Sequence, residues 1–391
     1  MRVVIVGGGF GGIRAALNLA NQPDFEVVLI SKLPYFEYRS ALYRSATGRS
    51  SREVAISLID FFAKDKNIKV VQDEIIHIDH QKKLVAGLTQ SDYRYDVLIL
   101  ALGAVTQYFG IKGLAEFSYS VRSVKETLAL KRRLHEDLAV SHGSERNYVV
   151  IGGGATGVEL SGELISYLKH IRQKHGIKTR FNVDLIEAAS NLLPNLPVGF
   201  TDKVKRRIYH LGIKVYFNTA VKSETIDEIE LPRGEIKSHT VIWTAGVTNN
   251  PLFAKYLGVF ELGKGGKVIV NEYLEAEPSI FIIGDSAATL YGGMAQTAIA
   301  DANFVTANLK RKLKHRTKLL YQPKKPIYAI PAGPRWAAVL WGKTKFYGYP
   351  GWVLRRLADL RLYVTFLPLS KAMATWRAGF VIEESCPICK K

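Results

Sequence analysis

The chain has 391 residues, of which 54 are Lys or Arg and 35 are Asp or Glu, so its formal net charge is +19. The apolar share of 47% excludes a disordered chain, and having only two cysteines, Cys386 and Cys389, excludes a disulfide framework. Residues 306–391 carry 18 of the basic residues against three acids, so most of the charge lies there. We expect a nearly neutral body of two or three domains, followed by a basic C-terminal region.

Neither a targeting segment nor a membrane-spanning segment is predicted. A strand beginning at Arg2 runs directly into glycines, which does not fit a signal peptide. No apolar run reaches the roughly 18–20 residues needed to span a bilayer. The chain is expected to be cytoplasmic and not to cross a membrane, although it could lie on one.

The first predicted elements are a buried strand at 2–6 and a helix at 13–19, joined by a G-x-G-x-x-G loop. In this fingerprint Gly7 permits the tight turn, Gly9 lets the backbone approach a pyrophosphate, and Gly12 lets the helix pack closely on the strand. The helix N-terminus then offers free N–H groups to the phosphates. The loop residues predicted to bind the dinucleotide are Gly7, Gly8, Gly9, Phe10, Gly11 and Gly12.

The second predicted strand, at 26–30, ends in Ser31 instead of the acid that usually binds the ribose. A serine can still form a hydrogen bond with a hydroxyl, and Lys32 beside it adds a positive charge. Both residues are assigned to the same cofactor site.

The fingerprint recurs after a strand at 147–151, with a helix running from 158 to 174. A further strand at 182–186 ends in Glu187, which would accept a hydrogen bond from a ribose 2′-OH and repel a 2′-phosphate, so this site should prefer NADH to NADPH. One such loop could be an ordinary glycine-rich turn, but two predict two dinucleotides, usually NAD(P)H and FAD. The second loop contributes Gly152, Gly154, Ala155, Thr156 and Gly157.

With both fingerprints in place, the chain resembles the pyridine nucleotide-disulfide oxidoreductase superfamily, and within it the type II NADH dehydrogenases. The resemblance covers nearly the whole chain and is carried by segments 29–48, 95–103, 157–163, 241–246, 280–285 and 295–298. It implies a peripheral respiratory-chain flavoenzyme that passes electrons from NADH through FAD to a membrane quinone without pumping protons.

The resemblance also assigns further cofactor-binding residues. In segment 280–285 an apolar strand ends in Gly284, which allows close approach, and Asp285, which can accept a hydrogen bond from a ribityl hydroxyl. Asp285 and Ser286 would also serve as helix N-caps, which is the structural alternative. The other residues assigned in this way are Ala101, Gly103, Ala245, Gly246, Ala295 and Thr297.

Two residues are candidate catalytic residues. A helix is predicted at 295–309, and its N-terminus could stabilise the anionic reduced flavin. On it, Gln296 could form hydrogen bonds with flavin or quinone carbonyls, or be an ordinary surface residue. Glu159 lies near the start of the second fingerprint helix, where it could be a helix-dipole partner. The resemblance implies more for Glu159, namely contact with the nicotinamide end and proton handling.

Three departures and absences refine this prediction. Leu102 stands where the superfamily usually has threonine. Ala300 stands where a second glutamine is frequent, so quinone contacts could differ. Segment 38–45 contains no cysteine, although disulfide reductases and sulfide:quinone reductases need cysteines near the flavin. Electrons would therefore pass from the flavin directly to an acceptor.

The C-terminal region is predicted to contain amphipathic helices. Residues 352–367 place apolar side chains on one helical face, with Arg355, Arg356 and Asp359 off that stripe, and a second short run follows Pro368. A basic amphipathic segment with Trp and Tyr is typical of an interfacial membrane helix. The alternative is a helix docked on its own protein or on a dimer mate. The final C-x-x-C is interpreted as a loose reduced thiol pair, with a metal shared across a dimer as the alternative.

The predicted fold is α/β, with two Rossmann-like dinucleotide-binding domains and a C-terminal amphipathic membrane-binding segment. The FAD domain is predicted at 1–113 and 250–309, the NADH domain at 114–249, and the membrane-association region at 310–391. The predicted cofactors are FAD and NADH, with no metal. The predicted partners are quinone and the cytoplasmic face of the cell membrane, with a homodimer possible and no nucleic acid.

Three alternatives remain open from the sequence. One is a soluble NADH-dependent flavoprotein that reduces a protein acceptor such as a ferredoxin or rubredoxin, docked by the basic region. Another is a redox-sensing or nucleic-acid-binding flavoprotein that resembles apoptosis-inducing factor. The third is an NADH oxidase that reduces oxygen.

Overall fold

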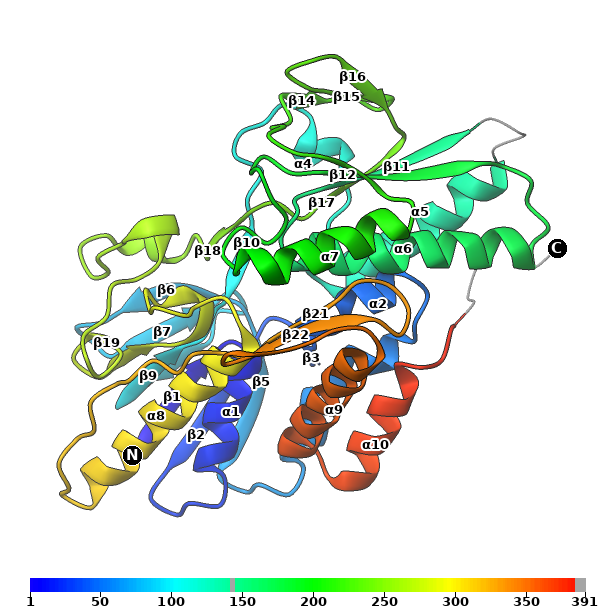
Figure 1. The fold of residues 1–391 in the computed structure, drawn as a ribbon. Helices are drawn as coiled ribbons and strands as arrows, with labels where there is room; N and C mark the ends of the chain where they lie inside the picture. The colour runs from blue at the N-terminus through cyan, green and yellow to red at the C-terminus, as the bar shows by residue number, and fades with distance from the viewer. Residues whose placement is uncertain (141–144, 384–391) are drawn as a thin grey trace. The chain divides into compact units, whose positions relative to one another are not determined.

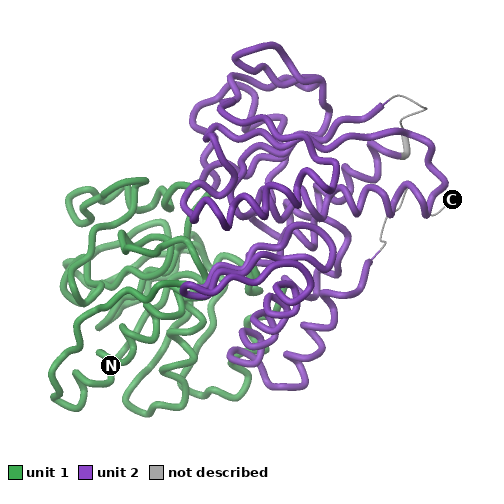
Figure 2. The backbone as a smooth tube through the Cα atoms, viewed as in Figure 1, with its two compact units in different colours: residues 1–38, 55–105, 247–326 green, residues 39–54, 106–246, 327–391 purple. Residues whose placement is uncertain are grey.

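The computed structural model describes residues 1–140 and 145–383, which form two compact units (Figure 2). Unit 1 comprises 1–38, 55–105 and 247–326, and unit 2 comprises 39–54, 106–246 and the C-terminal residues from 327 onward. This division differs from the predicted domains in two main respects. Residues 39–54 lie in unit 2, and the predicted membrane region is divided, with 310–326 in unit 1 and the rest in unit 2.

Unit 1 is built on a six-stranded sheet that is parallel except at one edge (Figure 1). Its strand order is β19 (Glu275–Glu277), β20 (Ile280–Ile282), β9 (Val97–Leu100), β1 (Arg2–Val6), β2 (Glu26–Ser31) and β5 (Ile68–Gln72). The middle strands are almost entirely apolar and buried, as expected for parallel strands covered on both faces. Helix α1 (Phe10–Leu19) connects β1 to β2 and packs beside α8 (Ala295–Leu313).

The remaining elements of unit 1 are short. They are β3 (Tyr35–Glu37), β4 (Ala55–Ser57), α3 (Leu58–Phe62), β6 (Ile75–Asp79), β7 (Leu84–Gly87) and β8 (Asp92–Arg94), with β6–β8 forming an antiparallel sheet. Strands β10 (Ala104–Thr106) and β18 (Val247–Asn249) form a two-stranded ladder.

Unit 2 repeats the same design with a smaller parallel sheet. Its order is β13 (Lys214–Tyr216), β12 (Phe181–Ile186), β11 (Arg146–Ile151) and β17 (Thr240–Trp243). The long helix α6 (Ala155–Lys174) connects β11 to β12, and its apolar side lies in a continuous core with both strands. The other elements of this part are α4 (Leu114–Phe117), α5 (Val124–Val140), α7 (Val198–His210), β14 (Ser223–Glu224), β15 (Glu228–Glu230) and β16 (Glu235–Lys237).

The C-terminal part of unit 2 begins with a three-stranded antiparallel sheet, formed by β21 (Tyr328–Pro331), β22 (Ala337–Trp341) and β23 (Thr344–Phe346). This sheet packs on α6, where the backbone at Gly333 lies so close to Gly162 that any side chain on Gly162 would clash. Helices α9 (Tyr349–Phe366) and α10 (Leu369–Ala378) follow and pack against each other, and α2 (Leu42–Ala46) belongs to the same unit.

The structure confirms the predicted α/β class, both strand–loop–helix motifs and the helical character of the two C-terminal segments. Among the described helices, none has the length and apolar composition that crossing a bilayer requires.

Candidate active site

The first glycine loop has the backbone geometry that a phosphate cradle requires. Gly7 has φ +117°, and a Cβ atom there would lie 2.3 Å from the carbonyl oxygen of Ala101. A Cβ on Gly12 would lie 1.9 Å from the carbonyl oxygen of Gly7, so glycine is required at both positions. At Gly9, no described atom lies within 4 Å of the Cβ position, and this open side borders the start of α1, whose first turn has no acidic residue. The loop therefore fits a dinucleotide pyrophosphate.

The second loop reproduces this geometry in unit 2. Gly152 has φ +111°, and a Cβ atom there would lie 2.7 Å from the Cα atom of Ala245. A Cβ atom on Gly157 would lie 1.8 Å from the carbonyl oxygen of Gly152. Gly154 again borders open space and caps α6, whose first turn, Ala155 and Thr156 included, has no acid. Two cradles of the same design therefore lie in separate units.

The polar residue after each second strand lies against its glycine loop. Glu187 accepts hydrogen bonds from the backbone N–H groups of Gly153 (2.5 Å) and Ala189 (2.7 Å), which places its carboxylate at the edge of the second loop. Ser31 occupies the equivalent place in unit 1, since a Cβ on Gly8 would lie 2.5 Å from its Oγ atom. Lys32 forms an exposed ion pair with Glu74 at 2.9 Å.

The Gly284–Asp285 turn forms a hydrogen bond with the buried carboxylate of Asp301. Gly284 has φ +72°, and its N–H donates to Oδ2 of Asp301 at 3.0 Å. The hydroxyl of Tyr321 donates to Oδ1 of the same carboxylate at 2.6 Å. Asp285 is half-buried in the short helix Gly284–Ser286, and Met294 caps α8, so Asp285 and Ser286 do not cap that helix.

Helix α8 begins with Ala295, Gln296 and Thr297 and has no acidic residue in its first turn, which leaves its positive dipole end unopposed. Gln296 is exposed, whereas the hydroxyl of Thr297 donates to the carbonyl oxygen of Tyr291 at 2.6 Å. In unit 1, Gly103 lies beside the Gly284 turn, because its carbonyl oxygen accepts a hydrogen bond from Ser286 at 3.2 Å.

Glu159 lies in a strongly charged part of unit 2. Burial raises the pKa of its carboxyl group to about 8, even though Arg355 and Arg44 act to lower it. Burial also raises the pKa of Glu163, one turn further along α6. The side chain of Glu159 is half-buried, and its nearest charges include Arg355 and Arg44.

A buried ion network lies beside Glu159. Arg44 forms a two-pronged pair with Glu53, at 2.8 and 3.0 Å, and also reaches Asp359 at 2.9 Å. Arg356 contacts Glu53 at 2.8 Å and Asp359 at 3.3 Å, and Arg355 also pairs with Asp359. All five side chains are at most 9% exposed. The network therefore joins segment 39–54 to α9 within unit 2.

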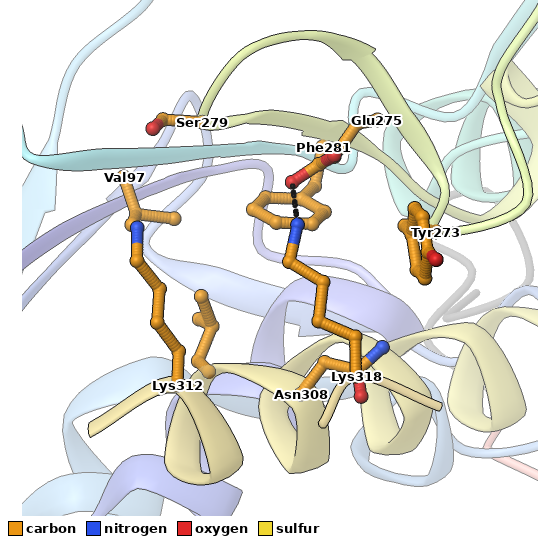
Figure 3. Close-up of a pocket in the computed structure, with 9 residues that line it drawn as sticks. Val97, Tyr273, Glu275, Ser279, Phe281, Asn308, Lys312 and Lys318 are labelled. Atoms are coloured by element: carbon orange, nitrogen blue, oxygen red, sulfur yellow. Dashed lines mark hydrogen bonds and ion pairs between the residues drawn. The ribbon is translucent and has the colours of Figure 1, made fainter. Parts of the chain in front are cut away.

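A separate, small pocket in unit 1 has a cavity volume of about 20 Å³ (Figure 3). Val97 and Ser279, which line it, lie at the amino ends of β9 and β20, whereas the first glycine loop follows the carboxyl end of β1. Because β1, β9 and β20 are parallel, the pocket lies at the amino ends of these strands and the phosphate cradle at their carboxyl ends. The pocket is therefore not the predicted cofactor site.

Comparison with protein families shows which family shares these motifs. The family model described as pyridine nucleotide-disulphide oxidoreductase matches residues 1–302, which include both glycine loops. The chain belongs to the pyridine nucleotide-disulphide oxidoreductase family. Both glycine loops, the Gly284 turn and the first residues of α8 lie within the matched part of this oxidoreductase.

The relatives of this oxidoreductase include type II NADH:quinone oxidoreductases, and the similarity extends over most of both chains. It is 29% identical to a type II NADH:quinone oxidoreductase of Mycobacterium tuberculosis, over 97% of this chain and 88% of the relative. It is 25% identical to the type II NADH:quinone oxidoreductase of Staphylococcus aureus, over 80% and 82%. The solved structure of Plasmodium falciparum NDH2 in complex with NADH has the same fold, with a TM-score of 0.85, 19% identity and 97% of both chains covered. The predicted resemblance is confirmed.

The charged neighbours of Glu159 were not predicted from the sequence. Arg355, Arg356 and Asp359 were placed only as residues off an apolar stripe, and no role was assigned to Arg44 or Glu53. The spacing of Arg355 and Asp359, which is that of a helical ion pair, was the available signal. The Cys386 and Cys389 pair lies outside the described residues.

Proposed function

We propose that this protein is an NADH:quinone oxidoreductase, with FAD held by unit 1 and NADH bound by unit 2. The observation that carries the proposal is the presence of two complete phosphate cradles, one in each unit. Bound FAD would supply the two-electron chemistry that links a hydride donor to a quinone. The relatives named above support the quinone as acceptor, and segment 38–45 contains no cysteine that could relay electrons to another acceptor.

The proposed roles in unit 1 follow from its backbone. The loop from Gly7 to Gly12 and α1 would bind the pyrophosphate, and Asp285 would accept a hydrogen bond from a ribityl hydroxyl. Ser31, at the end of β2, would contact the ribose. The N-terminus of α8 would stabilise negative charge that develops on the flavin, and Gln296 on its first turn would contact flavin or quinone carbonyls. Ala101, Gly103, Ala295 and Thr297 would form the backbone walls.

In unit 2, the loop from Gly152 to Gly157 would bind the NADH pyrophosphate, and Ala245 and Gly246 would line the nicotinamide side. Glu187 would accept a hydrogen bond from the ribose 2′-OH, in exchange for one of its present backbone contacts. A 2′-phosphate would meet this carboxylate at close range, so NADPH should bind poorly.

Glu159 is proposed to hold and transfer a proton during quinone reduction. A carboxyl group whose pKa is raised to about 8 keeps its proton at neutral pH and can donate it. Replacing Glu159 by Gln should remove the part of the pH dependence of quinone reduction that falls near pH 8, whereas FAD binding should be unchanged. A pH profile identical to that of the parent would exclude this role.

Helix α9 supports the proposed membrane contact, because three of its four charged residues are buried while some of its apolar residues are exposed. Arg355, Arg356 and Asp359 are buried in the ion network, whereas Leu357 and Val364 are 51% and 44% exposed. Leu369, at the start of α10, is 65% exposed. An apolar outer face on a helix next to tryptophans suits the interfacial region of a bilayer. We propose that this face attaches the enzyme to the cytoplasmic side of the cell membrane.

The test is an assay of the purified flavin-loaded protein with NADH and a soluble quinone, with and without lipid vesicles. We expect quinone-dependent NADH oxidation in both conditions, and its absence from both would exclude the proposed reaction. A triple Leu357→Ser, Val364→Ser, Leu369→Ser variant should lose vesicle binding but keep activity with the soluble quinone. The matched control replaces Ile59, Leu88 and Leu257, which are 62–70% exposed elsewhere, by Ser. Equal loss in both variants would argue against a specific membrane face.

A further inference from the structure

A second, separate concentration of positive charge lies at the C-terminal end of α8 and in the segment that follows it. Residues 310–325, called here the basic loop, comprise the last turn of α8 and the segment after it, and contain eight Lys or Arg residues and no Asp or Glu. They belong to unit 1, whereas α9 and α10 belong to unit 2. The eight residues are Lys310, Arg311, Lys312, Lys314, Arg316, Lys318, Lys324 and Lys325.

The backbone of the basic loop is held in place by hydrogen bonds. The buried side chain of Asn308 donates to the carbonyl oxygen of Leu319 at 3.0 Å and accepts from its N–H at 2.8 Å. Arg311 donates to the carbonyl oxygen of Thr317 at 2.6 Å, and the N–H of Tyr321 donates to the carbonyl oxygen of Glu272 at 2.8 Å. A surface that is ordered before binding loses less conformational entropy when a partner arrives.

Most of the charge on this ordered loop is not neutralised. Lys318 pairs with Glu275 at 3.2 Å and lies over the ring of Tyr273 (Figure 3). Lys312, Lys314 and Arg316 are exposed or partly exposed cations that form no ion pair with an acid of the described residues. In addition, burial and the nearby charge of Lys314 lower the pKa of Lys310, so the cations crowd one another. An anionic partner would relieve this repulsion.

Two leucines lie among these cations. Leu319 is 45% exposed and Leu320 is 62% exposed, and Lys318 and Lys324 flank them in the sequence. Phosphates of a nucleic acid would leave both leucines in water, and an acidic protein would need a matching apolar recess. A bilayer of anionic lipids offers phosphate headgroups to the cations and an apolar layer directly beneath them for the leucines.

We propose that the basic loop is an anionic-lipid contact of unit 1, in which Lys312, Lys314 and Arg316 bind headgroups while Leu319 and Leu320 enter the acyl boundary. This inference rests on the membrane association proposed above and gives α9 and the basic loop different roles in it. The outer face of α9 attaches to lipid whatever the headgroup charge, and the basic loop makes attachment selective for anionic lipid. Neither contact needs the other to be formed first.

The experiment measures cosedimentation of the full-length, flavin-loaded protein with phosphatidylcholine vesicles, with and without phosphatidylglycerol. The first variant is Lys312→Gln, Lys314→Gln, Arg316→Gln, and the second is Leu319→Ser, Leu320→Ser. The matched control removes the same charge from exposed residues elsewhere in unit 1, by Lys64→Gln, Lys66→Gln, Lys69→Gln. Activity with a soluble quinone checks that every variant is folded and loaded.

The charge variant should bind anionic vesicles about a hundredfold more weakly at low salt, because each cation at such a surface contributes about fivefold. Its binding to neutral vesicles should not change, and the leucine variant should be weakened on anionic vesicles. Anionic binding equal to that of the control would overturn the proposal, as would a charge variant that lost binding to duplex DNA but not to vesicles. If vesicle binding were lost only in the Leu357→Ser, Val364→Ser, Leu369→Ser variant, the membrane face on α9 would be supported and the proposed role of the basic loop would be wrong.

Discussion

Replacing Asp359 by Asn tests whether the ion network secures α9 to segment 39–54. The carboxylate of Asp359 is fully buried and contacts three guanidinium groups, those of Arg44, Arg355 and Arg356. The substitution keeps the shape of the side chain but removes its charge. Glu53, which contacts Arg44 and Arg356, would then be the one carboxylate left in the network for three arginines.

The expected loss is about 3–5 kcal/mol in the free energy of unfolding, because removing one member of a buried ion pair leaves an uncompensated charge in a medium of low polarity. Adding Arg355→Gln restores the original net charge of the network. The double variant should therefore be more stable than the sum of the two single losses predicts, with a coupling of about 1–3 kcal/mol.

Urea unfolding followed by circular dichroism measures these losses, and limited proteolysis reports whether α9 and α10 detach first. The control is Glu230→Gln, which breaks the exposed pair with Lys222 at 3.7 Å and should cost under about 1 kcal/mol. A loss for Asp359→Asn no larger than this control would refute the reasoning. So would strict additivity in the double variant, because it would mean that the charges do not interact.

Three further substitutions test other parts of the molecule. Glu187→Gln should lower discrimination against NADPH, and an unchanged ratio of kcat/KM for NADH and NADPH would contradict its assignment. Asp301→Asn should weaken the hold on the Gly284 turn and hasten FAD loss, measured by the flavin absorbance retained after gel filtration, whereas Asn303→Asp on the same helix serves as the control. Burial raises the pKa of Glu224 from 4.5 to about 8, and its Oε2 atom has no hydrogen-bond partner among the described residues. The unfolded chain loses this proton above pH 4.5 and the folded protein only near pH 8, so this group alone should make stability fall with rising pH by up to about 1.4 kcal/mol per unit across that window. Glu224→Gln should make the slope shallower, and the remaining slope would come from other carboxyl groups with a raised pKa, such as Glu159.

Local patterns predicted the dinucleotide-binding elements well, because the constraints on them are local. The strand predicted at 2–6 is β1 (Arg2–Val6), and the predicted helix ending at 174 is α6 (Ala155–Lys174). Each glycine serves its own turn or its nearest strand, so spacing alone identifies it. The placement of Glu187 on the second loop follows from the same rule, since parallel strands bring their carboxyl ends to one edge of the sheet.

The surroundings of Glu159 could not be predicted in this way, because they come from three distant segments. Arg44 and Arg355 are separated by more than 300 residues in the chain, and no periodicity in either segment indicates the other. The divided C-terminal region has the same cause. Composition placed residues 310–391 together because they share a positive charge, whereas packing assigns 310–326 to unit 1.

Helix α9 shows most clearly what a periodic pattern leaves undetermined. The stripe of apolar residues along 352–367 was recognised, but periodicity alone does not tell which face points inward. In a globular protein the apolar face is normally buried, and here Arg355, Arg356 and Asp359 share the buried side with Tyr363 and Phe366, because Arg44 and Glu53 pair with two of the three charges. The network therefore allows the helix to expose Leu357 and Val364 while it brings Arg355 beside Glu159. One helix would then serve both proposed needs of the enzyme, a face for the membrane that dissolves the quinone and a positive charge beside the acid that would supply the proton.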